Sequence, residues 1–247
     1  MKAIFLGTNG WYGTATGATV CTLIDAPGGP VILDAGDGIH KADRHIAPTS
    51  PVVILLSHVH IDHISGLHIL NKFDFQGGLS IYGPPGTADA IRTIVAPPYT
   101  VPLDGLRYPA VVRDLREGAH RLPFSVECRG LVHSAVCFGY RISSGGRTIA
   151  YCADTGYCAA AVELARGADL CIAECSYAPS QRNSAWPHLN PEEAARIALE
   201  AGARRLALTH FDARIYSDRL LREEARRAAS GIFKETVAAY DDMVIEL

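Results

Sequence analysis

The segment SHVHIDHISGL, which begins at Ser57 and directly follows the apolar run Val52–Leu56, most constrains what this chain can fold into. Within six residues it places three histidines and one aspartate: His58, His60, Asp62 and His63. Imidazole and carboxylate ligands together suit zinc, iron or manganese better than metals that prefer thiolates. Four ligands this close in sequence cannot easily converge on one ion. The spacing therefore favours two neighbouring metal ions near the end of a strand.

Three further polar residues stand at the ends of apolar runs further along the chain. His133 stands just before one predicted strand, Asp154 follows a second, and His210 ends a third. Taken alone, each has a structural alternative, since a lone histidine is more often a satisfied structural residue and Asp154 could cap a helix. Their coincidence with the His-x-His-x-Asp-His segment favours a metal site that is built from several strand ends.

Short apolar runs separated by glycine and proline predict the secondary structure. Strands are expected at residues 3–6, 19–24, 31–33, 52–56, 79–82, 125–129, 138–143, 148–151, 170–173, 205–209 and 243–247, and helices at 86–96, 158–166, 191–201 and 218–229. Asn190 is the expected N-cap of the third helix, with a proline directly after it. Both halves of the chain run strands first and helices later, which predicts two β-sheets packed face to face with helices outside. Because no linker divides the chain, we expect residues 1–247 to form a single domain.

The composition narrows the possible partners and the compartment. The net charge of −3 argues against indiscriminate binding to a phosphate backbone. No run reaches the ~20 apolar residues of a membrane span, so we expect no membrane partner and a cytoplasmic protein. The seven cysteines contain no C-x-x-C pair and lie mostly in apolar runs. We predict that they pack the core in a reducing compartment.

The segment from His58 to His63 resembles the signature of the metallo-β-lactamase fold superfamily. The downstream His133, Asp154 and His210 follow in the order of that family. Further segments resemble the branch that contains ribonuclease Z, a tRNA 3′-end endonuclease, and the small cyclic-phosphate phosphodiesterases of phosphonate metabolism: LGT (6–8), LDAG (33–36), the segment 133–142, ADTG (153–156) and THFDAR (209–214). The likeness covers nearly the whole chain. It implies an α/β fold, a four-layer αββα sandwich.

The resemblance also implies a ligand set for two divalent metal ions, with zinc expected first and manganese or iron as alternatives. One ion would be held by His58, His60 and His133, and the second by Asp62, His63 and His210, with Asp154 bridging the two. A hydroxide shared by the two ions would then be the nucleophile. Asp34 is expected to orient a ligand rather than to bind metal, with a role in stabilising a turn as the alternative.

His188 is the residue that distinguishes the phosphodiesterase branch, in which a histidine just before the helix at 191–201 protonates the leaving group or holds a phosphate oxygen. Its alternative is a surface-loop histidine. Together with the ligand Asp62, it is a predicted catalytic residue. Candidates for the wall of the pocket are the aromatic residues Trp11, Tyr12, Tyr99 and Trp186.

The substrate is constrained by what the chain lacks. Asp154 follows His133 by only 21 positions, and two strands and a turn fill this interval, so it has no room for the arm with which the tRNA endonucleases grip RNA. The cysteine-rich zinc site of the cyclic-phosphate enzymes is missing too, because only Cys21 precedes Cys128. We therefore expect a phosphodiesterase that acts on a small or cyclic phosphodiester. A ribonuclease Z-like endonuclease acting on RNA is the first alternative, and a lactonase, thioesterase or sulfatase the next. The family suggests a homodimer.

Overall fold

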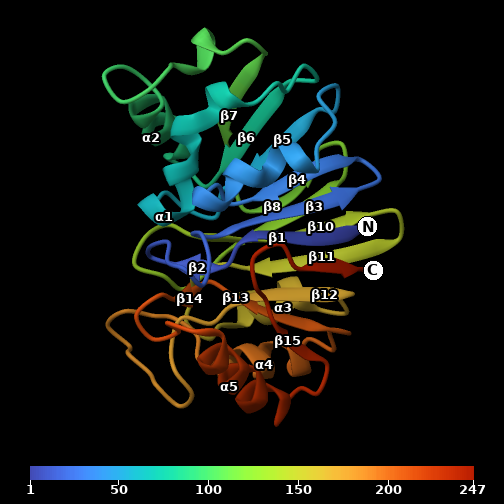
Figure 1. Cartoon of the computed structure of the whole chain (residues 1–247). Helices are drawn as coiled ribbons and strands as arrows, with labels where there is room; N and C mark the ends of the chain where they lie inside the picture. Colours follow the sequence, from blue (N-terminus) through green and yellow to red (C-terminus); the bar gives the residue numbers. More distant parts are fainter.

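The computed structural model describes residues 1–247 and contains two large β-sheets (Figure 1). The first sheet has the strand order β16-β1-β3-β4-β5-β6-β7 and the second β15-β13-β12-β11-β10-β9-β8, while β14 and β2 form a small separate sheet. The strands of the first sheet are β1 (Lys2–Gly7), β3 (Cys21–Ala26), β4 (Gly29–Leu33), β5 (Val52–Leu55), β6 (Leu79–Gly83), β7 (Ala110–Asp114) and β16 (Val244–Glu246). Those of the second are β8 (Gly118–Arg121), β9 (Ser125–Gly130), β10 (Phe138–Ser144), β11 (Arg147–Cys152), β12 (Leu170–Glu174), β13 (Leu206–Thr209) and β15 (Thr236–Ala238). The small sheet pairs β2 (Asn9–Gly10) with β14 (Phe211–Asp212).

Three apolar clusters separate the layers of the molecule. One lies between the two sheets, a second between the first sheet and its helices, and a third between the second sheet and its helices. The first sheet is covered by η1 (Asp37–Arg44), α1 (Ile61–Ile64), η2 (Ser65–Lys72), α2 (Thr87–Ile94) and η3 (Leu103–Gly105), and the second by α3 (Ala159–Ala165), α4 (Pro191–Glu200) and α5 (Arg219–Ser230). The predicted four-layer α/β sandwich is thus confirmed.

The central strands are largely apolar because both faces of each sheet are buried there. In β4, Val31 and Leu33 point into the cluster between the sheets, whereas Ile32 points toward the helices of the first sheet. In β12, Ile172 lies between the sheets and Cys171 packs against the other side. Successive side chains of a strand point to opposite faces, so a run without polar residues is what a doubly covered strand requires.

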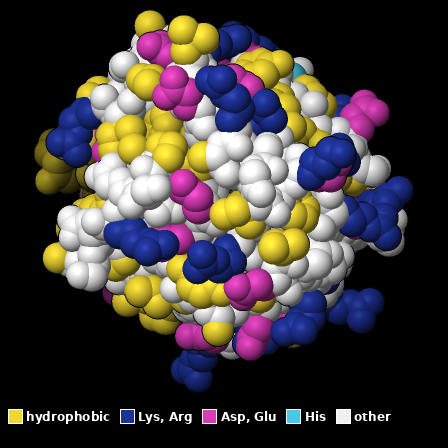
Figure 2. Space-filling model, turned by 90° about the horizontal axis from the view of Figure 1, so that it is seen from below, with side chains coloured by type: hydrophobic (Ala, Val, Ile, Leu, Met, Phe, Trp, Pro, Cys, Tyr) yellow, Lys and Arg dark blue, Asp and Glu magenta, His cyan; other side chains and the backbone are white.

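Two helices of the second sheet, α4 and α5, begin where a side-chain cap satisfies free backbone N–H groups of the first turn. Asn190 accepts a hydrogen bond from the backbone N–H of Glu193 at 2.9 Å, which confirms its predicted role as the N-cap of α4. Asp218 caps α5 in the same way. Figure 2 shows the face over the helices of the second sheet, where Lys and Arg side chains are interspersed with Asp and Glu. Such a mixed surface does not offer the single-sign field that attracts a phosphate backbone.

Cysteines contribute to these cores as predicted. Six of the seven are buried, Cys158 is half-buried, and all seven are free thiols. No helix of the protein combines the length and the apolar character that crossing a bilayer demands.

Several parallel strands end at one edge of the sandwich, where β2, β14 and α1 also lie (left in Figure 1). β4 and β5 run parallel, as do β11, β12 and β13. Loops at the carboxyl ends of such strands form the usual ligand-binding edge of an open parallel sheet. The segments that follow these five strands carry Asp34, His58, Asp154, Ser176 and His210.

Candidate metal centre

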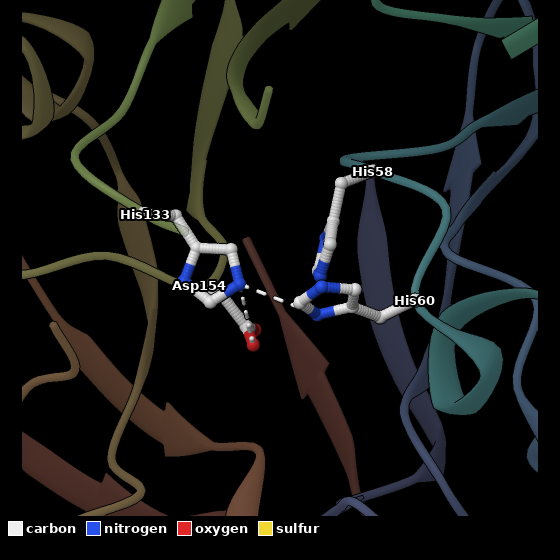
Figure 3. A group of neighbouring side chains, drawn as sticks. All are labelled: His58, His60, His133 and Asp154. Carbon is white, nitrogen blue, oxygen red and sulfur yellow. Dashed lines mark hydrogen bonds and ion pairs between the residues drawn. The ribbon is translucent and has the colours of Figure 1, made fainter. Parts of the chain in front are cut away.

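All seven residues predicted as ligands come together at this edge, and they do so in two groups. The first group consists of His58, His60, His133 and Asp154 (Figure 3), and the second of Asp62, His63 and His210. Within each group the potential ligand atoms lie within 4.8 Å of one another. The crowded HVHIDH segment is divided between the groups, because β5 ends before His58 and α1 begins at Ile61.

Asp154 lies between the two groups. Its Oδ1 is 3.3 Å from Nε2 of His63 and 3.3 Å from Nε2 of His210, both in the second group. Its Oδ2 faces the first group instead, 3.9 Å from Nε2 of His133. Asp154 is 3% exposed, so solvent water has little access to the two carboxylate oxygens.

The donor atoms fit divalent cations. The buried Nε2 of His58 has no hydrogen-bond partner, and the Nε2 atoms of His63 and His210 face each other at 3.0 Å. A buried polar atom without a partner is costly unless a ligand satisfies it. Imidazole nitrogens and carboxylate oxygens in this arrangement suit zinc, manganese or iron.

Protonation states in the first group also favour a cation. Burial lowers the pKa of His58, His60 and His133, so these imidazoles are neutral, as metal ligands must be. Burial alone would raise the pKa of Asp154, but His210 and His63 outweigh it and hold this pKa well below its usual range. Asp154 is therefore an anion inside the protein, where a bound cation would neutralise it.

Asp34 fixes the orientation of His63 through a hydrogen bond to Nδ1, the ring nitrogen that faces away from the second group. Its Oδ2 accepts hydrogen bonds from Nδ1 of His63 at 2.8 Å and from the hydroxyl of Tyr151 at 2.6 Å. The backbone N–H and the hydroxyl of Ser57 also donate to this carboxylate. These contacts leave Nε2 of His63 directed toward the second group, so Asp34 orients a member of that group and does not itself belong to either group.

Replacing Asp34 by alanine should weaken metal binding about 10–100-fold, the range seen when a partner of a metal ligand is removed. The measurement is a competition titration with a chelator of known affinity. Asp25→Ala is the matched control, because Asp25 pairs only with Lys2 at the surface. Equal metal affinity in Asp34→Ala and Asp25→Ala would contradict the orienting role.

The absence of a side chain at Gly10 leaves space for the ring of His210 in the second group. The β2 segment pairs with β14, the segment that directly follows His210. A Cβ at Gly10 would lie 2.5 Å from Cε1 of the His210 ring and 2.7 Å from Nδ1, closer than real Cβ contacts allow. Next to it, the backbone N–H of Trp11 donates to Oδ2 of Asp62 at 2.7 Å. This short segment therefore positions two residues of the second group.

Gly10→Ala should displace His210 and reduce the metal bound by the second group, while the first group stays intact. Metal analysis of the purified variant should show a loss approaching one equivalent. Gly13→Ala is the control from the same loop, because a Cβ at Gly13 meets its nearest atom at 3.7 Å. Full metal content in Gly10→Ala would show that the small sheet does not constrain His210.

His188 lies beside both groups and is held by a residue that the sequence did not single out, Glu174. Nδ1 of His188 donates to Oε1 of Glu174 at 2.7 Å and lies 3.9 Å from Oδ2 of Asp154. Glu174 is fully buried and also accepts hydrogen bonds from the backbone N–H groups of Thr155 and Ser176. The available signal was a carboxylate at the end of a buried apolar strand, the same signal that marked Asp154.

The charge of Glu174 controls the protonation of His188. Burial alone would lower the pKa of His188, but the Glu174 carboxylate and its hydrogen bond, together with Asp154, raise it to about 9. The imidazole is thus protonated on both nitrogens, and therefore cationic, at neutral pH. Because Nδ1 is engaged by Glu174, Nε2 is the nitrogen that is free to face a ligand.

The groups open into a pocket of about 520 Å³. Its lining includes His60, Asp62, Asp154, His188 and His210, and both tryptophans, Trp11 and Trp186. Tyr12 and Tyr99, the other aromatic candidates, are not among the residues that line it. Another cavity of about 550 Å³ lies beside β7 and contains none of the ligand residues. The chemistry therefore belongs to the pocket at the strand ends.

The fold, the two groups of metal-binding side chains and the open pocket define a metal-dependent hydrolase. The chain matches the beta-lactamase superfamily domain over residues 30–211, and it belongs to that superfamily. It is 28% identical to ribonuclease Z of Bacillus thuringiensis (strain Al Hakam) over 305 residues, which covers 98% of this chain and 97% of the relative.

Solved structures also resemble the whole chain, among them the following two. The metallo-beta-lactamase fold protein YhfI from Bacillus subtilis matches with a TM-score of 0.84 and 25% identity, over 100% of this chain and 99% of that one. The short form of human tRNase Z matches with a TM-score of 0.77 and 26% identity, over 100% and 99%. These likenesses extend beyond the ligand residues to the full sandwich.

Proposed function

We propose that the protein is a phosphodiesterase that cleaves a small or cyclic phosphodiester, with two divalent cations, zinc first, held by the two groups. His58, His60 and His133 would hold one cation, Asp62, His63 and His210 the other, and Asp154 both. The observation that carries the proposal is the His188–Glu174 pair beside these groups, 2.7 Å from nitrogen to oxygen. A held, protonated imidazole at this place suits a reaction in which an alkoxide leaves.

The residues of the chain divide the work in this proposal. Bound cations supply a water of lowered pKa and neutralise charge on the phosphoryl group. His188 donates a proton from Nε2 to the leaving oxygen, and Glu174 keeps the ring oriented and charged. Asp62 is held toward its group by the backbone N–H of Trp11. Asp34 and Gly10 keep His63 and His210 in place from opposite sides.

A small substrate is favoured over a folded RNA by the surroundings of the pocket. Between His133 and Asp154 the chain forms β10, a tight turn and β11, so no RNA-gripping arm is inserted there. The alignment with ribonuclease Z extends over 305 residues, more than the 247 of this chain, so the relative has segments that this chain lacks. A pocket of about 520 Å³ suits a ligand of nucleotide size.

A ribonuclease Z-like endonuclease is the second candidate, and the names of the relatives favour it. Turnover of bis(p-nitrophenyl) phosphate by the zinc- or manganese-loaded protein, without 3′-end cleavage of precursor tRNA, would support the small-substrate phosphodiesterase. Efficient cleavage of precursor tRNA would overturn it in favour of the endonuclease. Turnover of a lactone, thioester or aryl sulfate without any phosphodiester turnover would replace both with another hydrolase of the same fold.

A further inference from the structure

Both tryptophans of the chain line the same pocket, and both are about half exposed. The chain has only two, Trp11 and Trp186, with exposed fractions of 56% and 49%. Tryptophan is usually well buried, because its large apolar surface is costly to leave in water. Two half-exposed tryptophans beside one set of ligand residues therefore indicate contact with a bound molecule.

Nothing in the backbone requires a tryptophan at position 11. Trp11 adopts φ +70°, a conformation that glycine takes without strain and bulky residues rarely adopt. The hydrogen bond to Asp62 uses its backbone N–H, which any residue but proline could supply. The side chain lies instead under the Arg214 guanidinium, whose Cζ is 4.3 Å from the ring centroid. A bulky residue kept at a strained backbone position, with its ring exposed at a pocket, points to a role for the ring itself.

Trp186 forms an aromatic surface beside the first ligand group. Its ring is parallel to that of His60, with an interplanar angle of 2° and centroids 6.4 Å apart, and its centroid lies 6.3 Å from that of His133. The hydroxyl of Tyr177 donates to the backbone carbonyl of Trp186 and holds this part of the loop between β12 and α4 (Figure 1). A planar group bound at the first ligand group would meet this ring.

Two amide side chains from the same loop add hydrogen-bond donors to the pocket. Oε1 of Gln181 accepts from the backbone N–H of Ala178 at 3.1 Å, and Oδ1 of Asn183 accepts from that of Ala185 at 3.0 Å. Each oxygen is thus used within the loop, and each NH2 group is left without a protein partner while its residue lines the pocket. NH2 donors next to aromatic rings match a flat heterocycle whose edge carries acceptors.

We propose that the phosphodiester substrate carries a nucleobase. Trp186 and Trp11 select it by packing against the flat faces of the base, and Gln181 and Asn183 donate hydrogen bonds to the edge of the base. The inference rests on the proposed phosphodiesterase function and names its substrate class. Stacking on an aromatic side chain is tolerant of base identity, because every base has a flat face. Trp11 and Trp186 are therefore specificity-determining residues for nucleotides as a class.

The tryptophans themselves report on the test, because no other indole contributes to the fluorescence. Titration of the zinc-loaded protein with adenosine 5′-monophosphate should quench this fluorescence, whereas ribose 5-phosphate, which lacks the base, should quench little and bind more weakly. Trp11→Phe and Trp186→Phe each leave one indole and should each retain quenching. Trp186→Ala should weaken adenosine 5′-monophosphate about 10–100-fold, as removal of a stacking partner does, with binding of ribose 5-phosphate unchanged.

Control measurements separate stacking from damage to the site. Trp186→Phe should restore most of the affinity that Trp186→Ala loses, and Tyr99→Ala, an exposed aromatic outside the pocket, should bind like the unmodified protein. Equal affinity for adenosine 5′-monophosphate and ribose 5-phosphate would overturn the inference. Equal affinity for adenosine 5′-monophosphate and phenyl phosphate would overturn the nucleobase assignment, because a benzene ring has no acceptors at its edge.

Failure of this inference and failure of the proposed function give different results. If bis(p-nitrophenyl) phosphate is cleaved but the base makes no difference to binding, the phosphodiesterase stands and the nucleotide assignment falls. If no phosphodiester is cleaved, the proposed function falls, and the substrate assignment falls with it.

Discussion

Asp154→Ala should remove most of the bound metal and essentially all of the turnover. Asp154 is the only residue whose two carboxylate oxygens face both groups, one 3.3 Å from His63 and His210, the other 3.9 Å from His133. Its loss would leave three imidazoles and no anion in the first group, and Asp62 as the one carboxylate of the second, so too little charge remains to compensate two divalent cations. Metal analysis and steady-state kinetics on bis(p-nitrophenyl) phosphate measure the two effects.

The control for Asp154→Ala is Asp104→Ala, a surface aspartate in η3 far from both groups. It should retain full metal content and rate. Thermal unfolding followed by circular dichroism will show whether Asp154→Ala is still folded, which a loss of activity alone cannot. Two full metal equivalents in a folded Asp154→Ala variant would refute its position as the shared ligand.

His188→Ala has a different signature, because it should keep its metal and lose rate. Nδ1 of His188 is engaged by Glu174, and the ring belongs to neither group. Removal of a general acid lowers the rate on the order of 10²–10⁴-fold. The comparison of metal content with kcat therefore separates His188 from the ligands. A wild-type kcat in His188→Ala would contradict the general-acid role. His120→Ala, on β8, is the control.

The role of Glu174 can be read from the pH dependence of the rate. A general acid works while protonated, so the rate is present below its pKa and is lost as the pH rises through it. Glu174 raises the pKa of His188 to about 9 against the effect of burial. Glu174→Gln keeps the size of the side chain but removes its charge, so the alkaline limb of the pH profile should move to lower pH. An unmoved limb would show that another group donates the proton.

That the seven residues of the two groups come together could be predicted because most of them leave a local mark. His58 and His210 follow apolar strands directly, and parallel strands bring their ends to one edge. The same reasoning predicted the strands with buried faces on both sides. Edge strands such as β7 and β8 escaped it, because their half-exposed residues do not form an uninterrupted apolar run.

Residues that act through distant contacts could not be predicted in this way. Gly10 matters only because β2 pairs with β14, about 200 positions away, and brings a backbone against the His210 ring. Glu174 matters because the loop after β12 returns His188 to it. The role of Gly10 follows from the packing of remote segments, and no local pattern in the sequence encodes it. Glu174 carries the local mark of a carboxylate at the end of an apolar strand, but its contact with His188 does not follow from that mark.

The ligand groups have one consequence for the assembly of the molecule. Each takes side chains from both halves of the chain: His58 and His60 join His133 in the first, and His63 joins His210 in the second. A cation held by either group would therefore cross-link the two sheets at one edge of the sandwich, and removing the cation would remove this link. Binding to the folded state alone adds about 2.7 kcal/mol of stability when the metal concentration is 100 times Kd. Removing the metal would then weaken the association between the two halves of the chain. Neither half alone could assemble a complete group.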